Sequence, residues 1–337
     1  MPKQKIAFFE LNPSQKRYLK SKLSKTFDVS FYNVPLDLNL VGEVKDIEIL
    51  GVFINSKVNK DLIDKLPKLK QIVTLSTGYD HIDIKYAQKK GIVVCNVPHY
   101  GENTVAEHTF ALILALSRKI VESNERVKKG IFSPKGLTGF DLKGKTLGVI
   151  GCGNIGKNVI KIAHGFSMNL LVFDLCPDSF LKSTYGLKYV QLPELYKKSD
   201  IITLHVPYNK HTHHLLDRAA FLQMKKGVMI INTARGGLIE TDALYDALME
   251  GKVSFAGLDV LEEEKALAEE AELLHQNLEG DKDLSILIRD HVLINHPNVL
   301  VTPHNAFNSK EAIKRILNTT IENIVYFVKG SPKNTLT

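Results

Sequence analysis

Short apolar segments alternate with polar, helix-compatible stretches from the start of the chain. In the first hundred residues the apolar segments are Lys5–Glu10, Asp28–Asn33, Ile47–Ile54, Gln71–Ser76 and Ile92–Asn96. Lysine-rich stretches that could form helices separate them. This alternation is typical of βαβ units, so it predicts an α/β fold with a parallel sheet.

The same alternation returns in the second half of the chain. The strands predicted there are Leu147–Ile150, Asn169–Asp174, Asp200–Leu204, Val228–Asn232, Ser254–Leu258 and Val299–Val301, with helices at Lys157–His164, Leu192–Lys198, Glu240–Glu250 and Lys310–Lys329. A chain of 337 residues exceeds a typical single core. We expect a first domain of residues 1–101 and 308–337, with residues 102–307 inserted as a second parallel-sheet domain.

An apolar stretch lies where the two predicted domains meet in sequence. Thr104-Val-Ala-Glu107 has the form of a capping box, which predicts a helix from Thr104 toward Lys129. The first half of this helix would be apolar nearly all round, as in a helix covered on more than one side. We expect it at the domain junction and in a subunit interface.

The second domain carries a dinucleotide-binding pattern. Gly151, Gly153 and Gly156 follow an apolar strand and precede a helix in a G-x-G-x-x-G arrangement. The first glycine permits a tight turn, the second lets a pyrophosphate approach the backbone, and the third lets helix and strand pack closely. The free N–H groups and the dipole of the helix N-terminus favour phosphate. The pattern therefore indicates a Rossmann-like unit.

Asp174 ends the strand after that helix, where the adenosine ribose lies in such a unit. A carboxylate accepts a hydrogen bond from a 2′-hydroxyl and repels a 2′-phosphate. The next residues, Leu175-Cys-Pro177, offer no arginine to hold a phosphate. The sequence therefore predicts NAD as the cofactor in preference to NADP.

Composition excludes several classes of function. The net charge of +7 comes from lysines spread along the chain, which favours a solvated surface over a nucleic-acid site. The apolar run Phe110–Leu116 is too short to span a membrane. Cys95, Cys152 and Cys176 lack disulfide or metal-site spacing, and the chain begins with a strand and not a signal peptide. We expect a cytoplasmic protein without a metal or a membrane partner.

Three strand ends in the second domain carry side chains suited to reducing a keto group. Arg235 follows strand 228–232, and a guanidinium can bind a carboxylate or carbonyl through two hydrogen bonds, although pairing with a structural carboxylate fits the local sequence equally well. His304 follows strand 299–301, and an imidazole can transfer a proton near neutral pH. His211, His213 and His214 are expected to be surface side chains. Strand 254–258 is followed by three glutamates at 262–264, and the local pattern does not show which of them could be catalytic.

Motifs along nearly the whole chain resemble the D-isomer-specific 2-hydroxyacid dehydrogenase family, and most closely its NAD-dependent D-lactate dehydrogenase branch. The motifs are Ser76–Asp83, Val97–His108, the glycine pattern, His205–Tyr208, Asn232–Gly236, Gly257–Val260 and Thr302–His304. The resemblance implies that Arg235 orients a 2-keto acid, that His304 is the acid/base, and that Glu264 holds the proton of His304. It also implies a substrate site formed by Thr77, Gly78, Tyr100 and Phe307, with the backbone amides of the first two receiving the substrate carboxylate.

The same resemblance extends the cofactor site. The implied positions are Thr104, Gly151, Gly153, Asn154, Ile155, Gly156, Asp174, His205, Val206, Pro207, Thr233, Ala234 and Asp259, the last near the nicotinamide amide. Two residues depart from the pattern, because Leu75 and Asn154 stand where arginine is frequent. The acidic segment Lys265–Asp283 resembles an insertion of the D-lactate branch.

The resemblance implies a homodimeric oxidoreductase that reduces pyruvate or a similar small 2-keto acid with NADH. A glyoxylate or hydroxypyruvate reductase would share every catalytic residue and differ in the substrate pocket. A corepressor-like protein that senses NADH is an alternative from a different class, and the complete set of Arg235, Glu264 and His304 favours an enzyme over it. Nucleic-acid binding through the basic surface would require an affinity that depends steeply on salt.

Overall fold

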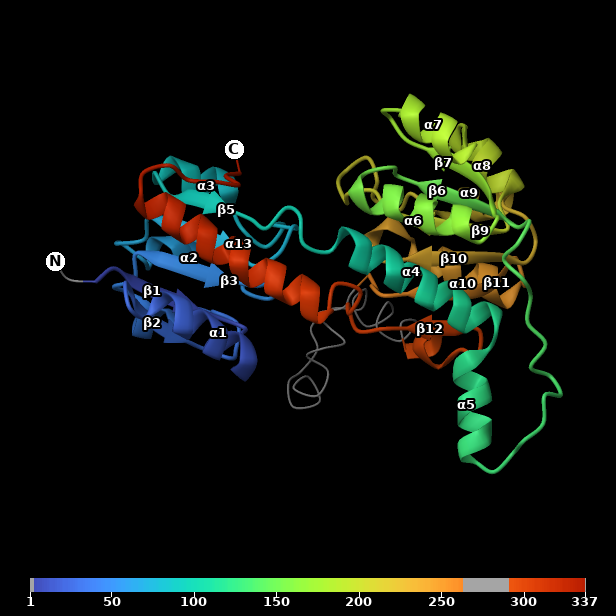
Figure 1. The fold of residues 1–337 in the computed structure, drawn as a ribbon, viewed down its shortest axis with the longest axis horizontal. Coiled ribbons are helices and arrows are strands. Elements are labelled where there is room, and N and C mark those ends of the chain that lie inside the picture. Colours follow the sequence, from blue (N-terminus) through green and yellow to red (C-terminus); the bar gives the residue numbers. More distant parts are fainter. Residues whose placement is uncertain (1–2, 263–290, 337) are drawn as a thin grey trace. The chain divides into compact units, whose positions relative to one another are not determined.

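The computed structural model describes residues 3–262 and 291–336. The chain forms two compact units (Figure 1). Unit 1 comprises Met1–Tyr100 and Ser309–Thr337, and unit 2 comprises Gly101–Asn308. The chain thus leaves unit 1 once, forms unit 2, and returns through its last helix.

Unit 1 is built on a five-stranded parallel sheet. Its strands are β1 (Lys5–Phe8), β2 (Asp28–Phe31), β3 (Ile49–Val52), β4 (Gln71–Thr74) and β5 (Val93–Cys95), in the order β2-β1-β3-β4-β5. Every neighbouring pair is parallel, as in Ile6 opposite Ile49. The five strands predicted for this region are confirmed, and the strand order is that of a flavodoxin-like sheet.

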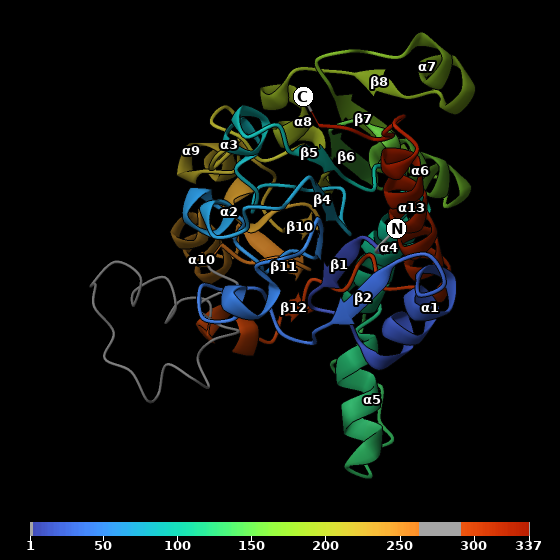
Figure 2. The ribbon, with the colours of Figure 1, turned by 90° about the vertical axis from the view of Figure 1, so that its left-hand side faces the viewer.

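Helices cover both faces of the unit 1 sheet. They are α1 (Pro13–Leu23), the 3-10 helix η1 (Val41–Val44), α2 (Lys60–Asp64), α3 (Ile84–Lys89) and α13 (Lys310–Val328). Helix α13 packs on β4 and beside α1 (Figure 2). On the other face, apolar side chains of α2 and α3 pack with strand residues such as Leu50 and Ile72. The central strands β3 and β4 are therefore buried on both faces, as is typical of parallel strands.

Unit 2 is built on a seven-stranded parallel sheet. Its strands are β6 (Thr146–Ile150), β7 (Asn169–Phe173), β8 (Lys188–Tyr189), β9 (Ile201–Leu204), β10 (Val228–Asn232), β11 (Val253–Leu258) and β12 (Val299–Val301). Their order is β12-β11-β10-β9-β6-β7-β8, so the chain changes direction across the sheet between β6 and β9. In open α/β sheets, ligands bind at the carboxyl ends of the strands beside such a switch point.

Two hydrophobic cores hold the helices of unit 2 on its sheet. The helices are α4 (Glu102–Ser117), α5 (Ile120–Lys128), α6 (Asn154–Gly165), α7 (Ser179–Tyr185), α8 (Leu192–Lys198), α9 (Arg218–Gln223) and α10 (Thr241–Met249), with the 3-10 helix η2 (Gly236–Leu238). Phe110 of α4 and Val159 of α6 belong to one core, whereas Phe221 of α9 and Leu244 of α10 belong to the other. Each predicted strand of this region is present, and so are the predicted helices at 157–164, 192–198 and 240–250, while β8, α7 and α9 were not predicted.

The N-terminus of α4 differs from the sequence expectation. The helix begins at Glu102 with Gly101 at its N-cap, and no side chain makes a capping hydrogen bond. Thr104 therefore lies inside the first turn, and the predicted capping box is wrong. The local pattern suited a cap, but the chain enters the helix two residues earlier.

The predicted continuous helix to Lys129 is also wrong. Helix α4 ends at Ser117, and Lys119 adopts a left-handed φ of 49° before α5 begins. The Ser117 carbonyl accepts a hydrogen bond of 3.0 Å from the N–H of Phe140, in the loop that returns to the sheet. This contact between residues distant in sequence replaces the next helical hydrogen bond, which local periodicity cannot reveal.

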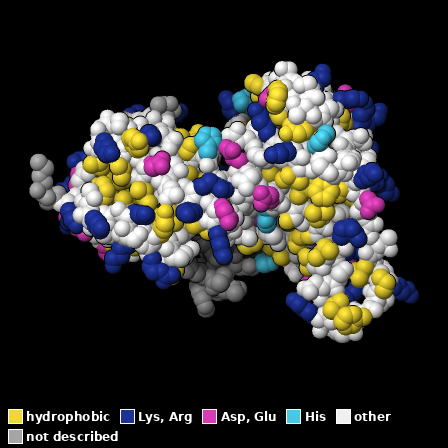
Figure 3. Space-filling view, in the orientation of Figure 1, with side chains coloured by type: hydrophobic (Ala, Val, Ile, Leu, Met, Phe, Trp, Pro, Cys, Tyr) yellow, Lys and Arg dark blue, Asp and Glu magenta, His cyan; other side chains and the backbone are white. Residues whose placement is uncertain are grey.

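Lysines and arginines are scattered over the surface seen in Figure 3 and do not form one block. Among the described residues, none of the helices combines the length and apolar character that crossing a membrane requires.

Candidate active site

The glycine turn between β6 and α6 has the shape that a dinucleotide requires. Gly151 has a φ of 96°, and a Cβ there would lie 2.5 Å from the carbonyl oxygen of His205. A Cβ on Gly156 would lie 2.1 Å from the Gly151 oxygen. By contrast, no atom lies within 4 Å of the place where a Cβ of Gly153 would sit. The turn is therefore closed on its protein side and open at Gly153, at the N-terminus of α6, where a pyrophosphate fits.

Asp174 lies immediately after β7, next to this turn. Its carboxylate accepts hydrogen bonds from the N–H of Cys152 at 2.5 Å and from the N–H of Cys176 at 2.8 Å. A carboxylate has about four acceptor sites, so these two bonds orient the group and leave capacity for ribose hydroxyls. The open glycine turn suits the pyrophosphate of NAD, and the carboxylate of Asp174 suits its ribose hydroxyls.

His205 supports the turn from the neighbouring strand β9. Its N–H donates to the carbonyl of Ile150 at 2.7 Å, and its Nε2 lies 2.9 Å from the hydroxyl of Thr203. Burial lowers the pKa of His205 to about 3, so the ring is neutral at ordinary pH. A neutral, anchored imidazole suits a structural role beside the cofactor.

The other predicted cofactor residues lie at strand ends and in the first turns of helices. Thr104 lies in the first turn of α4, Asn154 and Ile155 begin α6, Val206 and Pro207 follow β9, and Thr233 and Ala234 follow β10. Asn154 donates to the Glu102 carboxylate at 2.8 Å, which joins the first turns of α6 and α4. The Thr233 hydroxyl lies 3.0 Å from that of Thr109, which joins the end of β10 to α4.

Asn232, the last residue of β10, fixes the turn that carries Arg235. Its Nδ2 donates to the carbonyl of Arg235 at 2.8 Å, and its Oδ1 accepts from the N–H of Ala234 at 3.0 Å. A Cβ on Gly236 would lie 1.9 Å from the carbonyl oxygen of Leu261, so this turn packs directly on the segment after β11. The half-buried guanidinium of Arg235 also donates to the Ala234 carbonyl at 2.7 Å.

His304 lies in a strained turn after β12. Its φ is 48°, a region that few residues other than glycine adopt unless their surroundings impose it. Here the N–H of His304 donates to the carbonyls of Asp259 and Thr302, both at 2.9 Å. The N–H of Asp259 in turn donates to the Asn232 carbonyl at 2.9 Å. Backbone hydrogen bonds therefore join the ends of β10, β11 and β12, the three strands that precede Arg235, Asp259 and His304.

The carboxylate of Asp259 organises the turn after β12. It accepts hydrogen bonds from the hydroxyl of Thr302 and from the N–H groups of Asn305 and Ala306, at 2.8 and 2.9 Å, and His108 Nε2 lies 3.4 Å away. Burial alone would raise the pKa of Asp259, but the hydrogen bonds from His108, Thr302 and the backbone hold it below its usual value. The family resemblance implies a position for Asp259 near the cofactor, but the sequence did not predict its hydrogen bonds with the turn after β12.

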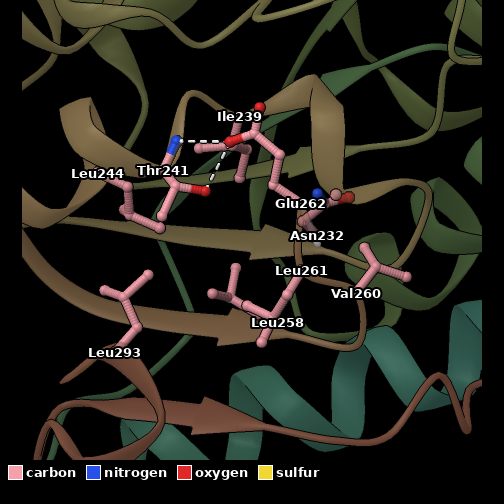
Figure 4. Close-up of a pocket in the computed structure, with 10 residues that line it drawn as sticks. Asn232, Ile239, Thr241, Leu244, Leu258, Val260, Leu261, Glu262 and Leu293 are labelled. Carbon is pink, nitrogen blue, oxygen red and sulfur yellow. Dashed lines mark hydrogen bonds between the residues drawn. The ribbon is translucent and has the colours of Figure 1, made fainter. Parts of the chain in front are cut away.

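Glu262 forms a second polar cluster outside the predicted catalytic set. Its carboxylate lies 2.5 Å from His214 Nε2 and accepts hydrogen bonds from Thr241, at 2.7 Å from the hydroxyl and 3.2 Å from the N–H (Figure 4). His214, expected at the surface, is half-buried. The small pocket beside this cluster is lined by Asn232, Gly236, Ile239, Thr241, Leu244, Leu258, Val260, Leu261, Glu262 and Leu293. Glu262 thus joins the segment after β11 to the loop that carries His214 and to the first turn of α10.

Glu264, the carboxylate that the resemblance pairs with His304, lies outside the described residues, and so does the segment Lys265–Asp283. The geometry of the described site therefore concerns Arg235 and His304. Phe307, three residues after His304, is half-buried in unit 2.

The predicted substrate residues of unit 1 follow β4 and β5. Thr77 is exposed and donates its hydroxyl to the Val97 carbonyl at 2.8 Å, and the hydroxyl of Ser76 donates to the Gly78 carbonyl at 2.6 Å. Within the described part of the chain, the N–H groups of Thr77 and Gly78 are not bonded to a protein acceptor. These two amides can receive an anion.

Leu75 and Tyr100 complete the predicted positions in unit 1. The side chain of Leu75 is buried, so this position contributes to the core and not to a polar pocket. Tyr100 is half-buried, and its carbonyl accepts a hydrogen bond of 2.6 Å from Nε of Arg315 in α13.

Comparison with known proteins shows which family the chain resembles. Residues 110–306 match the family model of the D-isomer specific 2-hydroxyacid dehydrogenase NAD binding domain. The chain is 37% identical to the D-lactate dehydrogenase of Escherichia coli over 332 residues, which are 97% of each protein. It is 32% identical over 317 residues to the glyoxylate reductase of Korarchaeum cryptofilum, covering 92% of this chain and 89% of that protein.

A solved structure is similar over nearly the full length. The D-lactate dehydrogenase of Aquifex aeolicus in complex with NAD and lactic acid superposes with a TM-score of 0.87 at 38% identity, covering 96% of each chain. The two-domain arrangement of parallel sheets is therefore shared with a protein that binds NAD.

Proposed function

The chain belongs to the D-isomer-specific 2-hydroxyacid dehydrogenase family, and from this premise we propose that it is a D-lactate dehydrogenase. It is an NAD-dependent oxidoreductase. The proposed reaction is the reduction of pyruvate, or of a similarly small 2-keto acid, with NADH. The observation that carries this proposal is the arrangement at β10, β11 and β12, whose ends present Arg235 and His304 on turns joined through Asp259.

Unit 2 is the proposed cofactor domain and unit 1 the proposed substrate domain. The family-model match to an NAD binding domain falls within unit 2. Bound NADH supplies a hydride. Unit 1 supplies the N–H groups of Thr77 and Gly78 for the substrate carboxylate, and Tyr100 and Phe307 are the further positions that the family resemblance assigns to substrate binding.

Arg235 and His304 have different roles at the substrate carbonyl. The guanidinium of Arg235 binds the keto acid through parallel hydrogen bonds and stabilises negative charge as it develops on the carbonyl oxygen. His304 donates a proton from its imidazolium to that oxygen and takes it back in the oxidation direction. A carboxylate beside a histidine favours the protonated ring, which is the role proposed for Glu264. Asp259 positions His304 through the backbone of its turn.

A panel of 2-keto acids assayed with NADH tests the substrate assignment. We expect the highest kcat/KM with pyruvate, lower values with larger side chains, and little activity with glyoxylate or hydroxypyruvate. Preference for either of the last two would make the chain a glyoxylate or hydroxypyruvate reductase, a function that the similarity to glyoxylate reductases makes the second candidate.

Asp174→Ala should erode the preference for NADH over NADPH. Loss of a hydrogen bond to a charged group costs about 10- to 100-fold in affinity, and removing the negative charge also relieves repulsion of a 2′-phosphate. The measurement is kcat/KM with each cofactor. Asp178→Ala, which removes the N-cap carboxylate of α7, is the matched control and should leave the ratio unchanged. An unchanged ratio in Asp174→Ala would assign the preference to another residue.

We also propose a homodimer formed through α5 and the loop that follows it. None of the residues of α5 is buried, and Ile120, Ile131 and Phe132 are exposed by 55, 50 and 82%. Figure 3 shows hydrophobic side chains gathered on this projecting part of unit 2. An apolar surface of this kind on one helix and its loop is typical of a protein interface.

The dimer proposal predicts that Phe132→Asp shifts the protein toward monomer in sedimentation equilibrium. Burying a new charge in an apolar interface without a partner is unfavourable. Leu222→Asp replaces a side chain that is 69% exposed on α9 and serves as the control. A wild-type protein that sediments as a monomer, or a Phe132→Asp variant with an unchanged dimer constant, would contradict the proposal.

A further inference from the structure

Three asparagines link the C-terminal part of unit 1 to the loop after β4. Nδ2 of Asn334 donates to Oδ1 of Asn323 at 2.8 Å, and Nδ2 of Asn323, in α13, donates to the carbonyl of Asn96 at 2.8 Å. Nδ2 of Asn96 donates to the carbonyl of Thr77 at 2.9 Å. We call Asn334, Asn323 and Asn96 the amide relay. Its members are separated by up to 238 residues in sequence, so the fold alone brings them together.

The relay lies largely in the core. Asn323 is fully buried and Asn96 is 7% exposed. The side chain of Gln71, also fully buried, donates to the Asn323 carbonyl at 3.1 Å. Buried amides are costly unless they are hydrogen-bonded, and an apolar core of the same shape would avoid that cost. In return, the hydrogen bonds of the three asparagine side chains fix one arrangement of the groups that they join, although Oε1 of Gln71 has no partner in the described part of the chain.

The acceptors define which side-chain atom donates in the two relay hydrogen bonds that end on backbone carbonyls. The carbonyls of Thr77 and Asn96 can only accept, so Nδ2 of Asn96 and of Asn323 must be the donating atoms. The backbone strengthens the connection, because the N–H of Asn96 donates to the Asn334 carbonyl at 3.1 Å. The C-terminal segment is thereby tied to the end of β5.

The contact at the end of the relay determines where one amide points. A trans peptide group is planar, and its C=O and N–H lie on opposite sides. Because Asn96 holds the Thr77 carbonyl toward the core, the N–H of Gly78 in the same peptide group faces the opposite way. Gly78 is partly exposed, and its N–H has no protein acceptor among the described residues. The Thr77 hydroxyl, bonded to the Val97 carbonyl, holds the same loop from its other side.

We propose that Asn96 is a positioning residue for substrate binding, which acts through the Thr77–Gly78 peptide group and is itself held by Asn323 and Asn334. This inference rests on the proposed function, in which the two loop amides receive the carboxylate of a 2-keto acid. Asn96 does not touch the reacting carbonyl. Asn96 favours binding of the carboxylate because it orients the Gly78 N–H before the substrate binds. This orientation lowers the free-energy cost of ordering the loop on binding.

Asn96→Leu tests the relay, since leucine retains the approximate volume and removes the donor. We expect KM for pyruvate, and the Kd of oxamate measured calorimetrically with the NADH complex, to rise together by about 10- to 100-fold, as when one hydrogen bond to a charged group is lost. The kcat at saturating pyruvate and the Kd of NADH should stay within a few-fold of the wild type. A merely structural role would not separate the carboxylate ligands from NADH in this way.

Thr320→Val is the matched control. Thr320 lies on the same helix as Asn323, is fully buried, and its hydroxyl has no hydrogen-bond partner in the described part of the chain. We expect wild-type values of KM, oxamate Kd and kcat, and a melting temperature that is unchanged or raised. The control thus separates removal of a buried polar group from loss of the relay.

Asn334 lies outside the core, so Asn334→Ala serves as a second test if Asn96→Leu does not fold. It should raise KM and oxamate Kd in the same direction by a smaller factor. Unchanged oxamate affinity in both variants, beside an active wild type, would overturn the relay alone. A wild type that binds NADH but neither reduces 2-keto acids nor binds oxamate would overturn the proposed function, and the relay with it.

Discussion

His304→Gln should lower kcat for pyruvate reduction by about 10²- to 10⁴-fold, the contribution of a positioned general acid. Glutamine can donate a hydrogen bond to the substrate carbonyl but cannot deliver a proton from a charged ring. The glycine turn and Asp174, which are the proposed cofactor residues, follow β6 and β7 and not β12, so the Kd of NADH should be unchanged. Stopped-flow measurement of NADH oxidation, together with fluorescence titration of NADH, gives both quantities.

His211→Gln is the control for that variant, because His211 is exposed and its side chain takes no part in the proposed site. It should have wild-type kinetics. The backbone of His304 has a left-handed φ, so the folded state of His304→Gln must be checked by its melting temperature. Near-normal turnover in a folded His304→Gln protein would refute the assignment of the acid/base.

Arg235→Ala should lower kcat by about 10²- to 10³-fold, the cost of removing one preorganised donor to a developing oxyanion, and it should also raise KM for pyruvate. Arg235→Lys retains the charge and loses the paired hydrogen bonds, so it should recover only part of the loss. Neither variant removes the hydrogen bonds that Asn232 makes with this turn, because the acceptor is the Arg235 carbonyl and the donor is the Ala234 N–H.

Steady-state kinetics with pyruvate, and oxamate titration of the NADH complex, measure the effect of the Arg235 variants. Arg218→Ala on α9 provides a control, since Arg218 pairs with Asp246 on the surface. Full recovery by Arg235→Lys would show that charge alone is needed. Wild-type kinetics in Arg235→Ala would make the guanidinium a structural group, the alternative that the sequence left open.

The sequence predicted most of the fold because its signals are local. A parallel strand is short and apolar on both faces, and the helices between strands have their own periodicity. The glycine turn could also be predicted, because its steric requirement depends on three glycines that lie close together in the sequence. Strand β8 has two residues and α9 has six, too few for a clear period.

Contacts between residues distant in sequence escaped prediction. The end of α4 depends on Phe140, which binds the carbonyl of Ser117 across 23 residues. Helix periodicity has no information about that partner. The capping-box pattern at Thr104 likewise misidentified the start of α4, because the chain already has helical geometry at Glu102.

The site residues show the same division. Arg235 and His304 could be proposed as site residues because each follows a predicted strand, and such ends meet at one edge of a parallel sheet. The hydrogen bonds that hold the turn of His304 could not be predicted, because Asp259 is separated from its partners after β12 by 43 to 47 residues. Asn323 and Asn96 are still further apart. No local pattern distinguishes a buried amide with such a partner from one on the surface.

Direct hydride transfer to the keto carbon can be tested by reducing pyruvate with NADH that carries deuterium at both C4 positions, followed by chiral separation and mass spectrometry of the product. We expect D-lactate with one deuterium at C2, because in the proposed mechanism hydride passes directly to a carbonyl that Arg235 orients and His304 protonates. L-lactate, or D-lactate without deuterium at C2, would contradict it.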